Sequence, residues 1–131
     1  MTLFKNAVTL RGFLTKDAEV PTSDQIEADS FAVLFLATVS GTWHIVGNEW
    51  VPRTTIHRVV CPGPYLCGFT RGMRWGDYVE VEGEIYVHDY ERPVVVEGEH
   101  FTAKRYASKV VAIQIRRLER PTLVVDMSEV G

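Results

Sequence analysis

The chain has 131 residues, which suits one domain with a buried core and is too short for two such domains. Its 14 lysines and arginines are outnumbered by 17 aspartates and glutamates, so the net charge of −3 argues against attraction of nucleic acid to the whole molecule but allows a local basic face. No apolar run reaches the ~18 residues of a membrane span, and the N-terminus lacks the features of a signal peptide, so we expect a cytoplasmic protein without a membrane partner.

The first part of the chain predicts two strands separated by a loop. Residues 4–14 alternate between apolar and polar, which is typical of a strand with one face in the core. Residues 16–29 are polar and predict a loop, whereas residues 30–40 are apolar on both faces and predict a central strand that is covered on both sides. Residues 41–52 carry two tryptophans and glycines, and we expect them to form a hairpin connection.

The middle of the chain predicts a strand, a short helix and another strand. Residues 50–61 are rich in β-branched side chains and predict a strand with both faces occupied. Pro64 suits the first turn of a helix, and apolar residues then recur at spacings of three and four. We expect Tyr65 in this helix and Trp75 at its exit to belong to the core.

After the helix the sequence alternates strictly and predicts a fourth strand. Its inward set is Val79, Val81, Ile85 and Val87. Its outward set includes Glu80, Glu82 and Glu84, which we expect to form an exposed acidic stripe. Residues 88–105 predict a second long connection with a small hairpin of its own, and residues 106–118 predict the last strand. In the last strand, Val111, Ile113 and Ile115 should share one face.

Five strands with one short helix between the third and fourth are the order of an OB-fold barrel, an all-β fold. We assign this domain to residues 1–118 and a short C-terminal tail to residues 119–131. Cys61 and Cys67 match no metal-ligand spacing, so we expect buried free thiols and no metal or other cofactor. His57 lies in the middle of a strand without ligand or catalytic partners, which favours a hydrogen-bonded structural histidine.

Five blocks of the sequence resemble, in order, the pattern of the bacterial-type single-stranded-DNA-binding protein family. They are N-A-V-T-L-R-G-F-L-T-K-D-A-E-V (6–20), F-A-V-L-F-L-A-T (31–38), N-E-W-V-P-R-T-T-I-H-R-V-V (48–60), G-D-Y-V-E-V-E-G-E-I (76–85) and R-Y-A-S-K-V-V-A (105–112). The resemblance implies an OB fold that assembles as a homotetramer, with a dimer as the alternative. It also implies sequence-independent binding of single-stranded DNA in replication, repair or recombination, with no cofactor and no catalysis.

The sequence departs from the family pattern at two aromatic positions and at its C-terminus. Ile56 stands where the family usually has a tryptophan, and Pro62 stands where it usually has another stacking aromatic residue. Most members also carry a linker rich in glycine, proline and glutamine that ends in an acidic tip and recruits partner enzymes. Residues 126–131 form no such tip, so the resemblance does not extend to recruitment through an acidic tail.

Binding a strand regardless of its sequence requires flat apolar surfaces for the bases and cations for the phosphates. The aromatic candidates are Trp43, Trp50, Tyr86 and Tyr90, with Phe101 in addition. The basic candidates are Arg11, Arg53, Arg58, Arg92, Lys104, Arg105 and Lys109. Packing at the barrel end or a subunit contact is the alternative for Trp50, a subunit contact is the alternative for Tyr86, and an ordinary solvated surface is the alternative for the cations.

Two other functions stay open on the sequence alone. An OB-fold accessory factor of the replication-restart type, acting mainly through protein contacts, is favoured by the loss of aromatic residues at Ile56 and Pro62. A small barrel enzyme would use His57 or the neighbouring pair His88 and Asp89. The enzyme is disfavoured because no set of nucleophile, base and orienting group can be assembled from the sequence.

Overall fold

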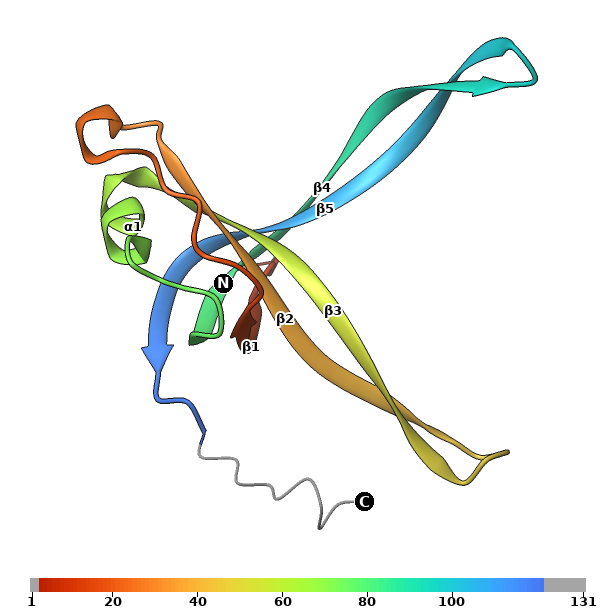
Figure 1. The fold of residues 1–131 in the computed structure, drawn as a ribbon, viewed down its shortest axis with the longest axis horizontal. Helices are drawn as coiled ribbons and strands as arrows, with labels where there is room; N and C mark the ends of the chain where they lie inside the picture. The colour runs from red at the N-terminus through yellow and green to blue at the C-terminus, as the bar shows by residue number, and fades with distance from the viewer. Residues whose placement is uncertain (1–2, 122–131) are drawn as a thin grey trace.

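The structure, a computed structural model, describes residues 3–121 as five strands with one short helix between the third and the fourth (Figure 1). The elements are β1 (Val8–Leu14), the 3-10 turn η1 (Ser23–Gln25), β2 (Phe31–His44), β3 (Glu49–Pro62), α1 (Gly63–Thr70), β4 (Tyr78–Val96) and β5 (Glu99–Leu118). The all-β class and the position of the helix are therefore confirmed. No helix in the described part of the chain is long and apolar enough to cross a membrane.

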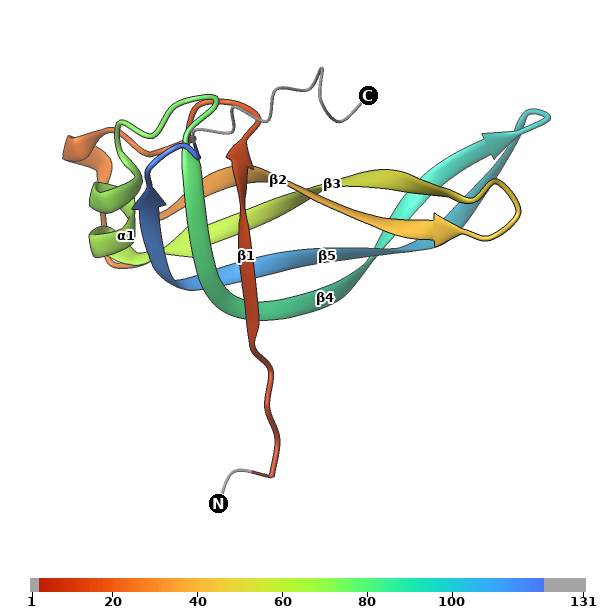
Figure 2. The same cartoon turned by 90° about the horizontal axis from the view of Figure 1, so that it is seen from below.

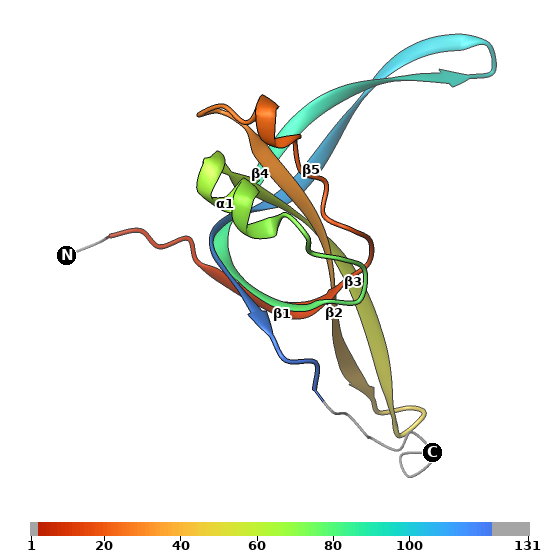
Figure 3. The ribbon, with the colours of Figure 1, turned by 60° about the vertical axis from the view of Figure 1, so that its left-hand side comes forward.

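The strands close into a barrel in the order β1-β2-β3-β5-β4, part of whose ring is seen in Figure 3. β3 and β5 are parallel and pair only where Val59 meets Val110 and Val60 meets Val111. The other neighbouring strands are antiparallel. The interior is filled by aliphatic side chains from every strand, among them Leu14, Leu34, Leu36, Val59, Val79, Val81 and Ile115. Removal of this apolar surface from water stabilises the closed barrel.

Helix α1 lies at one end of the barrel (Figure 2) and is fixed by the face that it buries. Leu66, Cys67 and Thr70 are buried, and the Thr70 hydroxyl donates to the carbonyl of Leu66 at 2.8 Å. Both cysteines are buried and free, as predicted. Burial, reinforced by Cys67, raises the pKa of the Cys61 thiol to about 12, so this thiol stays protonated at neutral pH.

The prediction that Tyr65 and Trp75 belong to the core is wrong. Their exposed fractions are 79% and 71%. The helix ends at Thr70, earlier than the spacing predicts, and Met73 fills the core from beyond the end of the helix. Tyr65 therefore lies on the outer side of α1, stacked on Phe69 with 6.3 Å between the ring centroids.

Two long hairpins extend beyond the barrel, away from α1 (Figure 2), and diverge from each other (Figure 1). We call them the β2–β3 arm (residues 37–56) and the β4–β5 arm (residues 84–109). Residues 41–52 and 88–105, predicted as connections, are mostly strand, because β2 stays paired with β3 and β4 with β5 almost to their turns. Neither arm has a face in the core, so the apolar alternation that marks a strand is missing from its sequence.

The tip of the β4–β5 arm is a turn of two residues. Glu97 and Gly98 both have positive φ, 52° and 81°, which is the mark of a type I′ hairpin turn. Glycine adopts this conformation without cost, whereas Glu97 is held in it by the two strands that it joins.

A β-bulge changes which residues of β5 face the core. Glu82 pairs with Gln114 but the next residue, Gly83, pairs with Ala112, so β5 carries one extra residue, Ile113. Ile113 is exposed, although strict alternation places it on one face with the buried Ile115. Ile85 and Val87, predicted to face the core, are exposed because β4 has left the barrel by that point.

The predicted acidic stripe is interrupted at Glu80, which is only 3% exposed. In register it lies between Arg11 of β1 and Arg116 of β5, and both guanidinium groups donate to its carboxylate, with Arg11 Nε at 2.9 Å. These hydrogen bonds, first that of Arg116 and then that of Arg11, hold the pKa of Glu80 below its usual value. Arg11 is thus part of an ion-pair network on the barrel wall.

Candidate nucleic-acid interface

Alternation sorts the side chains of the β2–β3 ribbon onto two faces. We call the face that points away from the barrel interior the outer ribbon face; it carries the odd-numbered residues of β2 and the even-numbered residues of β3. Trp43 and Trp50 face each other across the ribbon on this side, with exposed fractions of 56% and 57%. Arg58 lies on the same face nearer the barrel, whereas Arg53, paired with Ser40, lies on the opposite face.

The indole ring of Trp50 lies directly against the backbone of Gly41. A Cβ at Gly41 would come within 2.5 Å of the ring atoms Cε2 and Cζ2, closer than any real contact of that kind. Only glycine therefore leaves room for the ring in this position. Trp50 is held by the ribbon on one side while more than half of its surface stays open to solvent.

On the β4–β5 arm, aromatic and basic side chains face each other across the strands. The cross-strand pairs are Tyr86 with Lys109, Tyr90 with Arg105, and Val94 with Phe101. Successive pairs are four residues apart on each strand, so all of them lie on one side of the ribbon, which we call the aromatic–basic face. Its three aromatic side chains are exposed. Lys104 pairs with Glu91 and lies on the opposite face.

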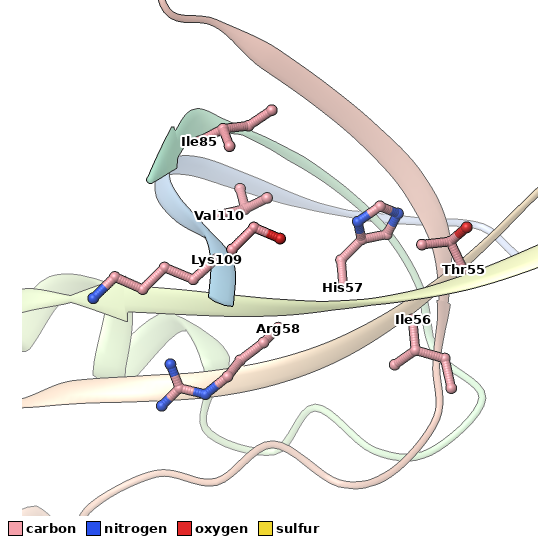
Figure 4. Close-up of a pocket in the computed structure, with 8 residues that line it drawn as sticks. Thr55, Ile56, His57, Arg58, Ile85, Lys109 and Val110 are labelled. Atoms are coloured by element: carbon pink, nitrogen blue, oxygen red, sulfur yellow. The ribbon is translucent and has the colours of Figure 1, made fainter. Parts of the chain in front are cut away.

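A pocket of about 270 Å³ lies where the two arms diverge (Figure 4). It is lined by Thr55, Ile56, His57 and Arg58 of β3, Ile85 of β4, and Ser108, Lys109 and Val110 of β5. In Figure 4, Thr55 and His57 leave one side of β3 and Ile56 and Arg58 leave the other. His57 shares a hydrogen bond of 2.8 Å with the Thr38 hydroxyl, as expected for a structural histidine.

In the described part of the chain, histidines, cysteines and carboxylates are too scattered for a metal site. Within residues 3–121, no three of these side chains lie close enough together to hold an ion. The pocket between the arms therefore offers apolar surface and cations rather than metal ligands.

Comparison with known proteins gives a clear answer for the fold. No protein-family model matches the sequence, and no curated protein sequence matches it. The solved structure of the SSB of Plasmodium falciparum in complex with single-stranded DNA matches 91% of this chain and 99% of that chain, with a TM-score of 0.69 and 17% identity. A deletion mutant of the single-stranded-DNA-binding protein from Thermus aquaticus matches 89% of this chain and 52% of that chain, with a TM-score of 0.65 and 23% identity.

A third match is the small single-stranded-DNA-binding protein from Streptomyces coelicolor, with a TM-score of 0.58, 18% identity and coverage of 87% of this chain and 95% of that chain. The chain has the fold of these proteins. This OB fold is the one that the order of the predicted elements indicates.

The structure brings together nine of the twelve predicted site residues on two surfaces of the OB fold. They are Trp43, Trp50 and Arg58 on the outer ribbon face, and Tyr86, Tyr90, Arg92, Phe101, Arg105 and Lys109 on the aromatic–basic face. Arg53 and Lys104 lie on the other faces of their arms, and Arg11 lies on the barrel wall beside Glu80. Sequence reasoning could not separate these sets because the face of an arm residue depends on the pairing register.

Proposed function

We propose that this chain binds single-stranded DNA without sequence preference in the cytoplasm and protects it during replication, repair or recombination, without catalysis. The aromatic–basic face carries this proposal. Every base has a π-face, and stacking on an aromatic side chain contributes about 1–3 kcal/mol per base. The cations between the rings neutralise phosphates, and the Plasmodium falciparum protein of the same fold was solved with single-stranded DNA.

Charge along the β4–β5 arm supports the same assignment. Between the first pair, Tyr86 and Lys109, and the last, Val94 and Phe101, this face of the described arm carries no carboxylate; Glu84, which accepts a hydrogen bond from the Tyr86 hydroxyl at 3.3 Å, and Glu99 lie on it beyond the two ends. The opposite face carries Asp89 and Glu91. A molecule with a net negative charge thus presents a local basic surface, which is sufficient to attract a phosphate backbone.

The pocket between the arms connects the two candidate surfaces. Arg58 belongs both to this pocket and to the outer ribbon face, and Lys109 belongs both to the pocket and to the aromatic–basic face. We infer that one strand of DNA passes from one arm to the other through this pocket. Ile56 contributes aliphatic surface on the way, 60% exposed.

We further propose that the chain acts as a homotetramer, with a dimer as the alternative. β1 pairs with β2 only at Phe13 and Leu14, so the edge of residues 8–12 has no partner strand on that side within the described chain. Such an edge is suited to pairing with a second copy. Binding and assembly are assigned to residues 1–118; of the tail at 119–131, residues 122–131, including the tip at 126–131, lie outside the described residues.

Titration of the intrinsic tryptophan fluorescence with oligo-dT at two salt concentrations tests the binding function. We expect quenching, with an affinity that falls as salt rises by about 0.7 log units per log unit of salt for each neutralised phosphate. Tyr90→Ala should lower the affinity about 5- to 100-fold, and Tyr65→Ala, at a more exposed tyrosine on α1, should not. Folded protein that shows no quenching at low salt would refute DNA binding.

A second candidate function is an OB-fold accessory factor that acts mainly through protein contacts. It is supported by the exposed aliphatic side chain of Ile56 and by Pro62 on the outer ribbon face. The absence of quenching in the same titration would favour this function.

A further inference from the structure

We propose that a second pocket, on the barrel wall, binds one nucleobase of the same DNA strand, with Trp75 as the stacking surface and Arg120 as the phosphate contact. The proposal rests on the function proposed above. The pocket has a volume of about 360 Å³ and is lined by Phe13, Leu14, Thr15, Ala37, Trp75, Gly76 and Arg120. Apolar surface with a cation at its rim suits a base and its adjoining phosphate.

The loop that carries the exposed Trp75 is fixed by hydrogen bonds of its backbone. The N–H of Trp75 donates to Oδ1 of Asp17 at 2.8 Å, and the N–H of the next residue, Gly76, donates to the carbonyl of Leu14 at 2.8 Å. The loop is thus held against the barrel on both sides of the ring. An indole with 71% exposure in a fixed loop is a preorganised flat surface, so little ordering cost would accompany stacking.

The charges around the pocket favour an anion. Asp17 is ion-paired with Arg74 at 3.3 Å and Asp77 with Arg117 at 3.2 Å, so these two carboxylates beside the loop are compensated. The guanidinium of Arg120 lies beside Gly76, with Nη2 at 3.5 Å from the point where a Cβ would stand. A phosphate next to a base stacked on Trp75 would therefore meet a cation.

The pocket is continuous with the surface proposed for DNA. Ala37, in its lining, belongs to the outer ribbon face and pairs with Ile56, which lines the pocket between the arms. Trp43 and Ala37 are six residues apart on β2, which is a separation of about 20 Å along the strand. A strand that follows the outer ribbon face from the arm tip to the barrel thus reaches Trp75.

The three tryptophans of the chain allow a direct test. The double variant Trp43→Phe, Trp50→Phe keeps aromatic rings at both positions and leaves Trp75 as the only tryptophan, which is excited selectively at wavelengths that tyrosine does not absorb. We expect oligo-dT to quench Trp75 and to saturate the quenching at the same concentration as the anisotropy of a labelled oligonucleotide. Binding by anisotropy with Trp75 unquenched would overturn the pocket and leave the proposed function intact. No binding by the unmodified protein would overturn both.

Variants at Trp75 and Arg120 separate stacking from charge, and a dilution series tests for protein contacts. Trp75→Ala should weaken binding about 5- to 100-fold, with Trp75→Phe recovering most of the loss and Tyr65→Ala as the control that has no effect. Arg120→Gln should reduce the salt slope by about 0.7 without abolishing the quenching of Trp75. Trp75 fluorescence that changes with protein concentration in the absence of DNA would mean that a second copy covers the pocket, and would refute the proposal.

Discussion

Gly41 leaves room for the indole ring of Trp50, which extends toward it from the neighbouring strand. A methyl group at this position would stand 2.5 Å from the indole of Trp50, so the ring must leave its place on the ribbon. We predict that Gly41→Ala lowers the affinity for oligo-dT by at most the loss of one stacked base, which is up to about 100-fold. Fluorescence titration measures this effect.

Gly47→Ala, on the same arm, is the control for this prediction. Its Cβ would meet only the side chain of Glu49, with Oε1 at 3.1 Å, and that side chain is free to move. An unchanged emission spectrum and affinity in Gly41→Ala would show that Trp50 does not depend on the glycine.

Glu80 makes stability depend on pH in a defined direction. Its pKa in the folded protein lies below the usual value of 4.5, so the folded state binds this proton less tightly than the unfolded state does. The stabilisation is complete above that value and is lost as the pH falls through the folded pKa. We predict that Glu80→Gln is less stable than the unmodified protein at pH 7, and that the difference in free energy of unfolding shrinks toward pH 3.

Urea unfolding at several pH values measures this difference. Glu82→Gln is a suitable control because Glu82 lies two residues along the same strand and is exposed. A gap between Glu80→Gln and the unmodified protein that stays constant from pH 7 to pH 3 would contradict the assignment.

At the scale of the elements, the two faces of the β4–β5 arm can be compared by substituting one basic residue on each. Lys104 and Arg105 are neighbours in the sequence and lie on opposite faces of β5. We predict that Arg105→Ala weakens binding to oligo-dT and reduces the salt slope by about 0.7, whereas Lys104→Ala changes neither appreciably. Equal effects of the two substitutions would mean that the arm does not present one face to DNA.

The strands of the barrel can be predicted from the sequence because a strand with a buried face has apolar residues at regular positions. The alternation through Val79 and Val81 and the apolar run at 30–40 both correspond to strands with core contacts, but the run is not covered on both sides as predicted, because Phe31 and Val39 are exposed. The sequences of the arms lack this pattern, because strands in solvent tolerate polar residues on both faces. The bulge at Ile113 is invisible for a related reason, since an extra residue shifts the alternation without changing the composition of the strand.

The candidate site is predictable in its chemistry and not in its geometry. Trp43 and Tyr90 stand out as large aromatic residues in polar stretches, which is unusual without a function. Whether Arg105 or Lys104 accompanies Tyr90 depends on the register between two strands. Trp75 was missed because helical spacing extends the predicted helix beyond Thr70, its actual end.

At the scale of the whole molecule, the open edge of β1 predicts self-association. Backbone groups along residues 8–12 that have no partner strand in the described chain would gain one by pairing with the same edge of a second copy. We predict a particle of four chains, with two as the alternative, by size-exclusion chromatography with light scattering. A single-chain mass at micromolar concentration would refute assembly through this edge.

The separation of arms from barrel has a consequence for how such a protein can diversify. The side chains that close the barrel lie outside the hairpin extensions, whose exposed residues contribute little to folding. Hairpins of different length or composition can therefore be grafted onto one scaffold while its melting temperature stays nearly constant. Selection can then tune ligand preference on the extensions without sacrificing the integrity of the scaffold.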